Sequence, residues 1–190
     1  MRSVFSVGAF VFGLALTAPA EPGVAQARDA GFEFELDLAN NLLRVRDVRP
    51  SALEEPLGER AKEFRVAVGS PAHPTPRGRF PLGRVIMRPA WTPGESAAAA
   101  GAERSAASLE SPMGVAKIPF AQGGAIALHG GGDPDVLGKP VSSGCIRASD
   151  ADLLRLIAWL HLRGALAETV EAPNGELLRD FQRPARLRIY

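Results

Sequence analysis

The chain has 190 residues, 46% hydrophobic and 23% charged, which excludes both a disordered chain and a multispan membrane protein. Its 20 glycines and 16 prolines favour turns and short strands over a helical bundle. A net charge of +1 argues against a general nucleic-acid binder, and the single cysteine excludes an internal disulfide and a cysteine-rich zinc site.

Residues 1–27 have the pattern of a signal peptide. One positive charge, at Arg2, precedes an apolar stretch over 4–16 that is too short to span a bilayer. Two small-x-small sites follow, and we expect cleavage after Ala27, because Pro19 disfavours the earlier site. An uncleaved N-terminal anchor is the alternative. Export makes the lone cysteine notable, because oxidising compartments favour paired cysteines.

Strands are predicted through the first half of the chain. Apolar residues alternate with acidic ones over 32–37, and Asn40 and Asn41 form a turn signal, so residues 31–47 predict a β-hairpin. Further strands are predicted over 64–69, 80–87 and 124–129.

Residues 88–114 are rich in alanine and serine and predict either a short helix or a mobile flap. Trp91, at the start of this segment, lines a substrate groove or packs in the core. One helix is clearly predicted after Ser149, where Asp152 completes a capping box and an apolar stripe runs up to Gly164.

The C-terminal part is predicted to be simpler. A short strand is expected near 166–170, and residues 171–190 form an arginine-rich tail. The tail arginines are expected on a solvated face, with polyanion or cell-wall binding as the alternative.

The most informative stretch runs from His129 to Asp152. An apolar strand leads to His129, a glycine-rich loop follows, and Cys145 stands just before the predicted helix. A thiol is mostly protonated at neutral pH, and a neighbouring imidazole can take its proton if its other nitrogen is held by an acceptor. Gly144 precedes the cysteine and allows backbone N–H groups to face a developing oxyanion.

These residues resemble a known family, the L,D-transpeptidase catalytic domain of bacterial peptidoglycan enzymes. The family has a histidine-glycine pair, a loop of roughly fifteen residues, and then serine-x-glycine-cysteine-apolar-arginine. Here the matching segments are 129–130 and 142–147. The turn over 75–80, Thr-Pro-Arg-Gly-Arg-Phe, and the Pro-Met-Gly segment at 112–114 are also similar, so the resemblance covers about residues 32–170.

The resemblance implies a role for each matching residue. Cys145 matches the acyl-enzyme nucleophile, His129 the general base, and Gly130 the residue whose carbonyl orients that base. The amides of Gly144 and Cys145 match the oxyanion donors, and Arg147 matches an arginine that orders the site or the substrate.

Two features depart from the family pattern. Ser143 stands where many members have histidine, which affects thiol acidity or substrate contacts without removing the base. The alanine- and serine-rich stretch at 95–111 is also unusual and puts the substrate-facing flap in doubt.

The resemblance implies a mainly β fold, a mixed β-sandwich with one or two short helices, over a catalytic domain at 28–170. It implies an exported enzyme of the bacterial periplasm or cell wall. Its partners would be peptidoglycan stem peptides, without nucleic acid, metal, cofactor or, after signal cleavage, membrane. The oligomeric state is not predicted. The cysteine would be acylated by a tetrapeptide stem with release of D-alanine, and the acyl group would pass to the side-chain amine of a second stem or of a wall-anchored protein.

Other interpretations remain open at this point. Water as the acceptor would make the protein an L,D-carboxypeptidase, and the same fold without catalysis would be a wall-binding module. A cysteine protease of another type is a third alternative. His73 is weighed as a substrate contact and His161 as structural, while the spacing of Asp133, Asp135 and Asp150 does not fit an EF-hand loop.

Overall fold

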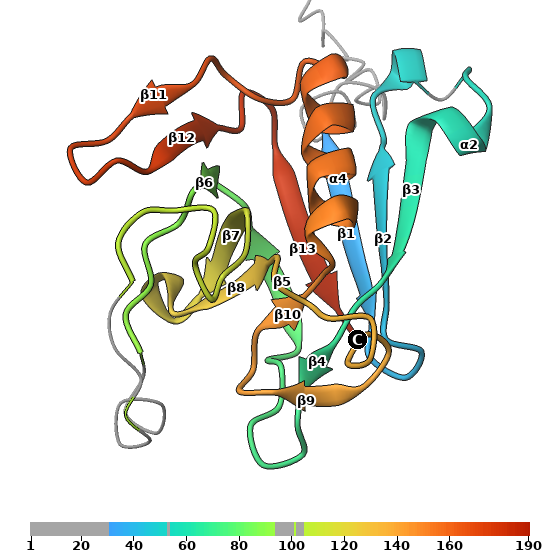
Figure 1. The fold of residues 1–190 in the computed structure, drawn as a ribbon. Helices are drawn as coiled ribbons and strands as arrows, with labels where there is room; N and C mark the ends of the chain where they lie inside the picture. The colour runs from blue at the N-terminus through green and yellow to red at the C-terminus, as the bar shows by residue number, and fades with distance from the viewer. Residues whose placement is uncertain (1–30, 53, 94–100, 102–104) are drawn as a thin grey trace, which may run out of the picture.

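The computed structural model describes residues 31–190 except 53, 94–100 and 102–104. The predicted signal peptide and its cleavage site therefore lie outside the described residues. None of the helices in the described part is long and apolar enough to cross a membrane. Figure 1 shows two main sheets, with one long helix running along the strands of one of them.

The first sheet has five strands in the order β3-β2-β1-β13-β5. The hairpin of β1 and β2 is antiparallel, whereas β1 and β13 are parallel. Alternation decides which side chains face inward, because successive side chains of a strand point to opposite faces. The bounds are β1 Phe32–Asp37, β2 Leu42–Asp47, β3 Ala61–Arg65, β5 Gly78–Pro81 and β13 Ala185–Ile189.

The second sheet has six strands in the order β10-β8-β7-β6-β12-β11, and β4 pairs with β9 in a separate two-stranded sheet. Most neighbours in the second sheet are antiparallel, but β8 and β10 are parallel. The bounds are β4 Val68–Gly69, β6 Arg84–Met87, β7 Ala116–Ala121, β8 Ile126–His129, β9 Pro140–Ser142, β10 Ile146–Arg147, β11 Val170–Glu171 and β12 Leu177–Asp180.

Helix α4 (Asp150–Leu162) is the long helix of Figure 1, and its start is fixed as the sequence predicts. The Ser149 side chain caps the helix by accepting the Asp152 N–H at 3.0 Å and donating to the Asp152 carboxylate at 2.7 Å. The chain leaves the helix through Gly164 at a φ of 64°. Three short elements complete the fold: η1 Pro50–Ala52, α2 Leu57–Arg60 and η2 Gln122–Gly124.

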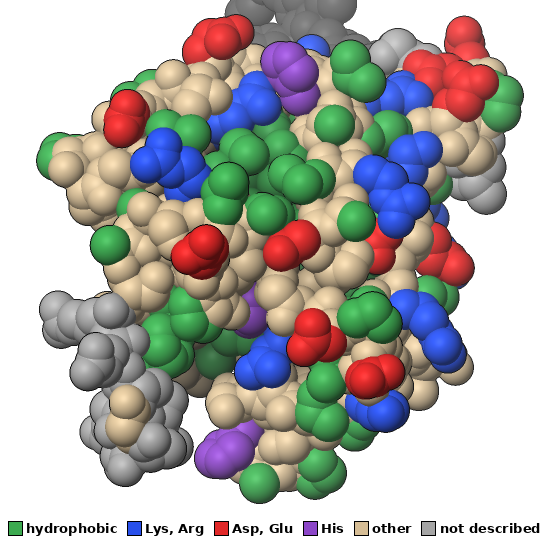
Figure 2. Space-filling model, in the orientation of Figure 1, with side chains coloured by type: hydrophobic (Ala, Val, Ile, Leu, Met, Phe, Trp, Pro, Cys, Tyr) green, Lys and Arg blue, Asp and Glu red, His purple; other side chains and the backbone are tan. Residues whose placement is uncertain are grey.

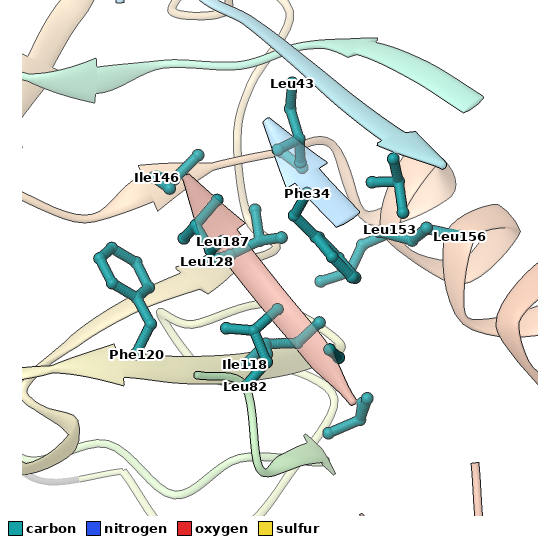
Figure 3. Packing of buried hydrophobic residues seen from close by; sticks show 14 of the residues in the cluster. Phe34, Leu43, Leu82, Ile118, Phe120, Leu128, Ile146, Leu153, Leu156 and Leu187 are labelled. Atoms are coloured by element: carbon teal, nitrogen blue, oxygen red, sulfur yellow. The ribbon is translucent and has the colours of Figure 1, made fainter. Parts of the chain in front are cut away.

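The core lies between the two sheets and the apolar stripe of α4. Phe34 from β1, Leu187 from β13, Leu128 from β8 and Leu153 from α4 come together there, as Figure 3 shows. Trp159 of α4 meets another inward side chain, Phe32, edge to face at 5.9 Å between ring centroids. Helix and sheets therefore share one core, which fixes where α4 begins relative to β8 and β10.

Several sequence predictions can be compared with these elements. The mainly β class with few helices is confirmed, as are the hairpin over 31–47 and the capped helix. The expected strand over 80–87 is split between β5 and β6, and β7 was not predicted. Within the alanine- and serine-rich segment over 88–114, backbone hydrogen bonds of 3.0 Å join Trp91 to Ser105, and residues 94–100 and 102–104 between them lie outside the described residues.

The C-terminal segment differs from the expected tail. Residues 185–189 form β13, which lies between β1 and β5, and residues 177–180 form β12 of the second sheet. Ala185, Leu187 and Ile189 are buried, while Arg186 and Arg188 point outward. Arg183, Arg186 and Arg188 are exposed as predicted, whereas Arg179 is buried. Residues 171–190 are part of the folded domain because their alternate residues fill its core.

Charges on the molecular surface are mixed. On the face shown in Figure 2, Lys and Arg side chains are interspersed with Asp and Glu side chains. Pairs such as Arg44 with Glu63 and Arg46 with Glu33 link neighbouring strands of the five-stranded sheet. This pattern fits the near-neutral net charge of the chain.

We expect Phe34→Ala to lower the free energy of unfolding by about 3–5 kcal/mol, because it removes a fully buried ring and leaves a cavity. Urea denaturation of the purified domain measures the change. Leu154→Ala, at a residue 43% exposed on α4, is the control and should cost less than about 1 kcal/mol. Equal losses for the two variants would contradict the position of the core.

Candidate active site

Two parallel strands bring three predicted side chains to one face. In the pairing of β8 with β10, Arg147 lies opposite His129, and Cys145 stands two residues before Arg147. Residues two apart on an extended chain point to the same side. His129, Cys145 and Arg147 accordingly line one cleft of about 580 Å³.

The glycine-rich loop after β8 holds the imidazole ring. His129 is 4% exposed, and its Nδ1 lies 2.7 Å from the Gly130 carbonyl oxygen. A carbonyl can only accept, so Nδ1 carries the proton and Nε2 keeps its lone pair. The neutral ring is thereby fixed in the tautomer that can accept a proton at Nε2.

The imidazole is held in its neutral form. Burial lowers the pKa of His129 to about 4, and the positive charge of Arg147 acts in the same direction. The backbones of Gly130 and Met113 and the charge of Asp150 oppose this shift. At neutral pH the ring is therefore an uncharged base.

A tight turn presents the cysteine. The buried Ser142 hydroxyl donates to the Cys145 carbonyl at 2.6 Å and accepts the Gly144 N–H at 3.1 Å. Gly144 has a φ of 108°, which only glycine adopts readily, and a Cβ there would lie 3.1 Å from a methyl group of Ile126. The turn thus depends on both Ser142 and Gly144.

The backbone amides in this turn are not equivalent. The Gly144 N–H is already bonded to Ser142, whereas no hydrogen bond between described residues uses the Cys145 N–H. In this structure the Gly144 N–H is therefore not free for the oxyanion role that the family resemblance implies. Gly144 contributes its backbone conformation, and the Cys145 amide stays available.

The thiol itself is also uncharged. Burial raises the pKa of Cys145, and the Ala127 backbone and Arg147 only partly offset this. The thiol lies 3.8 Å from the Ala125 carbonyl oxygen. Among the described residues, no hydrogen bond joins this thiol to the His129 ring. Because both pKa values are shifted toward the neutral forms, the resting pair is a thiol and a neutral imidazole rather than an ion pair.

The turn over residues 73–75 packs against the cysteine turn. The buried Thr75 hydroxyl accepts the Gly69 N–H at 2.8 Å, and the Ser70 N–H donates to Ser142 at 2.8 Å. A Cβ at Gly144 would lie 3.7 Å from the Pro74 carbonyl oxygen. The threonine-proline turn of the sequence is therefore part of the scaffold behind Cys145.

The cleft has a positive lining. Arg147 has a buried Nε without a hydrogen-bond partner among the described residues. Lys117 is neutralised by Glu176 at 3.3 Å and donates to the Ala90 carbonyl at 3.0 Å. The described residues that line the cleft include no carboxylate; they are Ala90, Trp91, Thr92, Pro112, Met113, Lys117, Gly124, Ala125, His129, Ser143, Cys145 and Arg147.

Comparison with known proteins identifies the domain. The model of the YkuD family, described as the L,D-transpeptidase catalytic domain, matches residues 51–170, more than half of the chain. The chain belongs to the L,D-transpeptidase catalytic-domain family. No curated protein matches it.

Solved L,D-transpeptidases share the fold at low sequence identity. The catalytic domain from E. faecium is 16% identical with a TM-score of 0.51, and the match covers 85% of this chain and 98% of that one. An L,D-transpeptidase from Mycobacterium tuberculosis H37Rv is 17% identical (TM-score 0.49; 84% and 57% covered), and one from Mycobacterium smegmatis is 18% identical (0.45; 85% and 59%). The chain thus spans less than two thirds of these mycobacterial chains.

Within this L,D-transpeptidase domain, the structure also places the residues that the sequence left open. Trp91 lines the cleft, whereas the exposed His73 does not. His161 lies 2.8 Å from Arg179, away from the cleft. Among the described residues, no cluster of three or more His, Cys, Asp or Glu could hold a metal ion.

Sequence analysis missed Lys117 as a cleft residue and Ser142 as the residue that holds the cysteine turn. Lys117 alternates with buried Ala116 and Ile118 in β7, a pattern that could have predicted the strand. Nothing in the sequence shows that β7 pairs with β8 and brings Lys117 opposite His129.

Proposed function

We propose that this protein is a cysteine acyltransferase of peptidoglycan, an L,D-transpeptidase that acts on tetrapeptide stems. The observation that carries the proposal is the His129 ring, held through Nδ1 on the Gly130 carbonyl, in one cleft with the only cysteine of the chain. Membership of the family supplies the substrate class. The predicted signal peptide agrees with a site of action in the periplasm or cell wall of a bacterium.

In the first half-reaction, Cys145 Sγ attacks the carbonyl carbon of the diamino acid at the third position of the stem. His129 Nε2 takes the thiol proton as the S–C bond forms, because the thiol is not ionised beforehand. The Cys145 N–H is placed to stabilise the oxyanion. The C–N bond to D-alanine then breaks, and the imidazolium returns its proton to the departing amine.

In the second half-reaction, the side-chain amine of another stem attacks the thioester. His129 takes a proton from the amine, the C–S bond breaks, and the thiol is restored. A new amide links the two stems, so bonds and protons balance without metal or cofactor. Water in place of the amine gives the carboxypeptidase product.

The proposal is tested by measuring the intact mass of the protein after incubation with a tetrapeptide donor. The expected gain equals the donor mass minus one D-alanine, located on Cys145 by peptide mapping. Adding a second stem as acceptor should convert this adduct into a cross-linked dimer. Absence of any adduct would argue for a non-catalytic wall-binding module, and release of only the tripeptide acid would argue for a carboxypeptidase.

Arg147 is expected to bind a carboxylate of the donor stem. Among the described residues, its buried Nε has no hydrogen-bond partner and no carboxylate lines the cleft beside it. A charge-assisted hydrogen bond contributes about 1.5–3 kcal/mol, so Arg147→Gln should lower the acylation kcat/KM by about 10- to 100-fold.

A donor with its terminal carboxyl group converted to an amide is the matched probe for this prediction. If Arg147 binds the terminal carboxylate, the amide donor should acylate the native protein slowly. Its acylation rate should then fall little further in Arg147→Gln. An equal fold loss for the two donors would show that Arg147 does not bind this carboxylate.

A further inference from the structure

Asp150, the first residue of α4, makes contacts that a helix terminus alone does not require. Its Oδ1 accepts the Val115 N–H at 3.0 Å and the Gly131 N–H at 2.9 Å. The carboxylate thus joins the loop after β8 to the segment that leads into β7. This oxygen lies so close to the backbone that residues 114 and 130 must be glycine, since a Cβ added at Gly114 or Gly130 would lie 2.2 or 2.0 Å from it.

One peptide unit connects Asp150 to the imidazole. The Gly131 N–H and the Gly130 carbonyl belong to the same planar peptide, and in its trans form these groups point in opposite directions. The N–H end is bonded to Asp150, and the carbonyl end receives the Nδ1–H of His129 at 2.7 Å. A continuous chain of two hydrogen bonds therefore runs from the carboxylate to the ring.

We propose that Asp150 is a positioning residue that completes a relay from carboxylate through peptide to His129, with the Gly130–Gly131 peptide between the two side chains. The carboxylate fixes the plane of this peptide and polarises it, which makes the Gly130 carbonyl a stronger acceptor. Hydrogen bonds in a chain strengthen one another in this way. This inference rests on the proposed function, in which His129 is the base.

The groups around His129 give this carboxylate a specific task. Arg147 faces the ring from β10, and Lys117, paired with Glu176, lies opposite it on β7. The Cys145 thiol lines the same cleft, and α4 contributes Asp150. Asp150 is the negative group that acts on the ring, and its charge raises the pKa of His129 against burial and Arg147. The imidazolium formed during attack is stabilised by the same charge.

A purely structural role would need only an acceptor for two amides. Asp150→Asn separates the two roles, because the asparagine oxygen can still accept both N–H groups but carries no charge. Asp152→Asn is the matched control. It removes the same charge from the first turn of α4, where Asp152 contacts Ser149 and Arg155 and, among the described residues, makes no hydrogen bond to the loop after β8.

The first measurement needs no substrate. In the native protein, the His129 Nδ1–H proton resonance is expected to lie downfield and to exchange slowly with water. It should move upfield in Asp150→Asn and stay in place in Asp152→Asn. An Nδ1–H signal that is unshifted and exchanges rapidly in the native protein would overturn the relay without recourse to any variant.

The second measurement is the acylation rate with a tetrapeptide donor across pH. We expect a loss of about tenfold in kcat for Asp150→Asn, from replacing a charged by a neutral hydrogen-bond partner, and less than twofold for Asp152→Asn. The acid limb of the profile should also shift to lower pH. Full activity with an unchanged pH profile in Asp150→Asn would show that Asp150 has only a structural role. If no donor acylates the native protein, the proposed function fails while the resonance still decides the relay.

Discussion

Replacing Cys145 by alanine is expected to abolish acylation completely. The sequence contains no other cysteine, so no second thiol can replace the lost nucleophile. Incubation with a tetrapeptide donor should leave the intact mass of Cys145→Ala unchanged, while the native protein gains the acyl group. No released D-alanine should be detected above the rate without protein.

Ser143→Ala is the control for formation of the adduct, because Ser143 lines the same cleft two residues before Cys145 and removing its hydroxyl leaves the thiol in place. It should keep the mass gain, since the cysteine turn is held by Ser142 and Gly144 and not by Ser143. Thermal unfolding of both variants should match the native protein, because Cys145 is only partly buried. Cross-linked product from Cys145→Ala would exclude the proposed chemistry.

The neutral resting state has consequences for the mechanism. Sequence reasoning leaves room for a thiolate stabilised as an ion pair with the imidazolium. The structure disfavours that state from both sides, since burial raises the pKa of Cys145 and lowers that of His129 to about 4. In the proposed mechanism, proton transfer then accompanies the attack on the substrate. A neutral thiol also resists adventitious oxidation, because the thiolate is the reactive form.

Local patterns predicted the parts of this protein that depend on neighbours in sequence. The hairpin follows from alternation around Asn40 and Asn41, and the start of α4 follows from Ser149 and Asp152. The candidate pair His129 and Cys145 was predicted from its motif. Each of these features is encoded within about twenty residues.

The remaining features depend on pairings between distant segments. The last strand, β13, lies parallel to β1. Its exposed arginines led to the prediction of a tail, although they alternate with apolar residues that fill the core. Lys117 reaches the cleft because β7 pairs with β8, and Asp150 reaches the Gly131 amide because α4 packs beside the loop. No local pattern specifies which strands become neighbours, so these contacts required the structure.

Replacing His129 by alanine is expected to lower the acylation rate at pH 7 by about 10²- to 10⁴-fold, the usual contribution of a general base. With a neutral thiol in the resting state, none of the other described residues that line the cleft offers a neutral base to take the proton. The loss should shrink as pH rises above the ordinary thiol range, because hydroxide then forms the thiolate directly. Stopped-flow or quenched mass measurements between about pH 3.5 and 10 give the acylation rates of the native protein and of His129→Ala.

The pH profile of the native protein tests the same residue. His129 accepts a proton only when neutral, and its pKa is about 4, so the native rate should hold down to about pH 5 and fall as pH passes through 4. His129→Ala should lack this acid limb, whereas His73→Ala, at an exposed turn outside the cleft, should keep both the rate and the limb. A native profile that falls near pH 6.5 instead would mean that the imidazole is solvated and not buried as a neutral base. Retention of the acid limb in His129→Ala would assign it to another group.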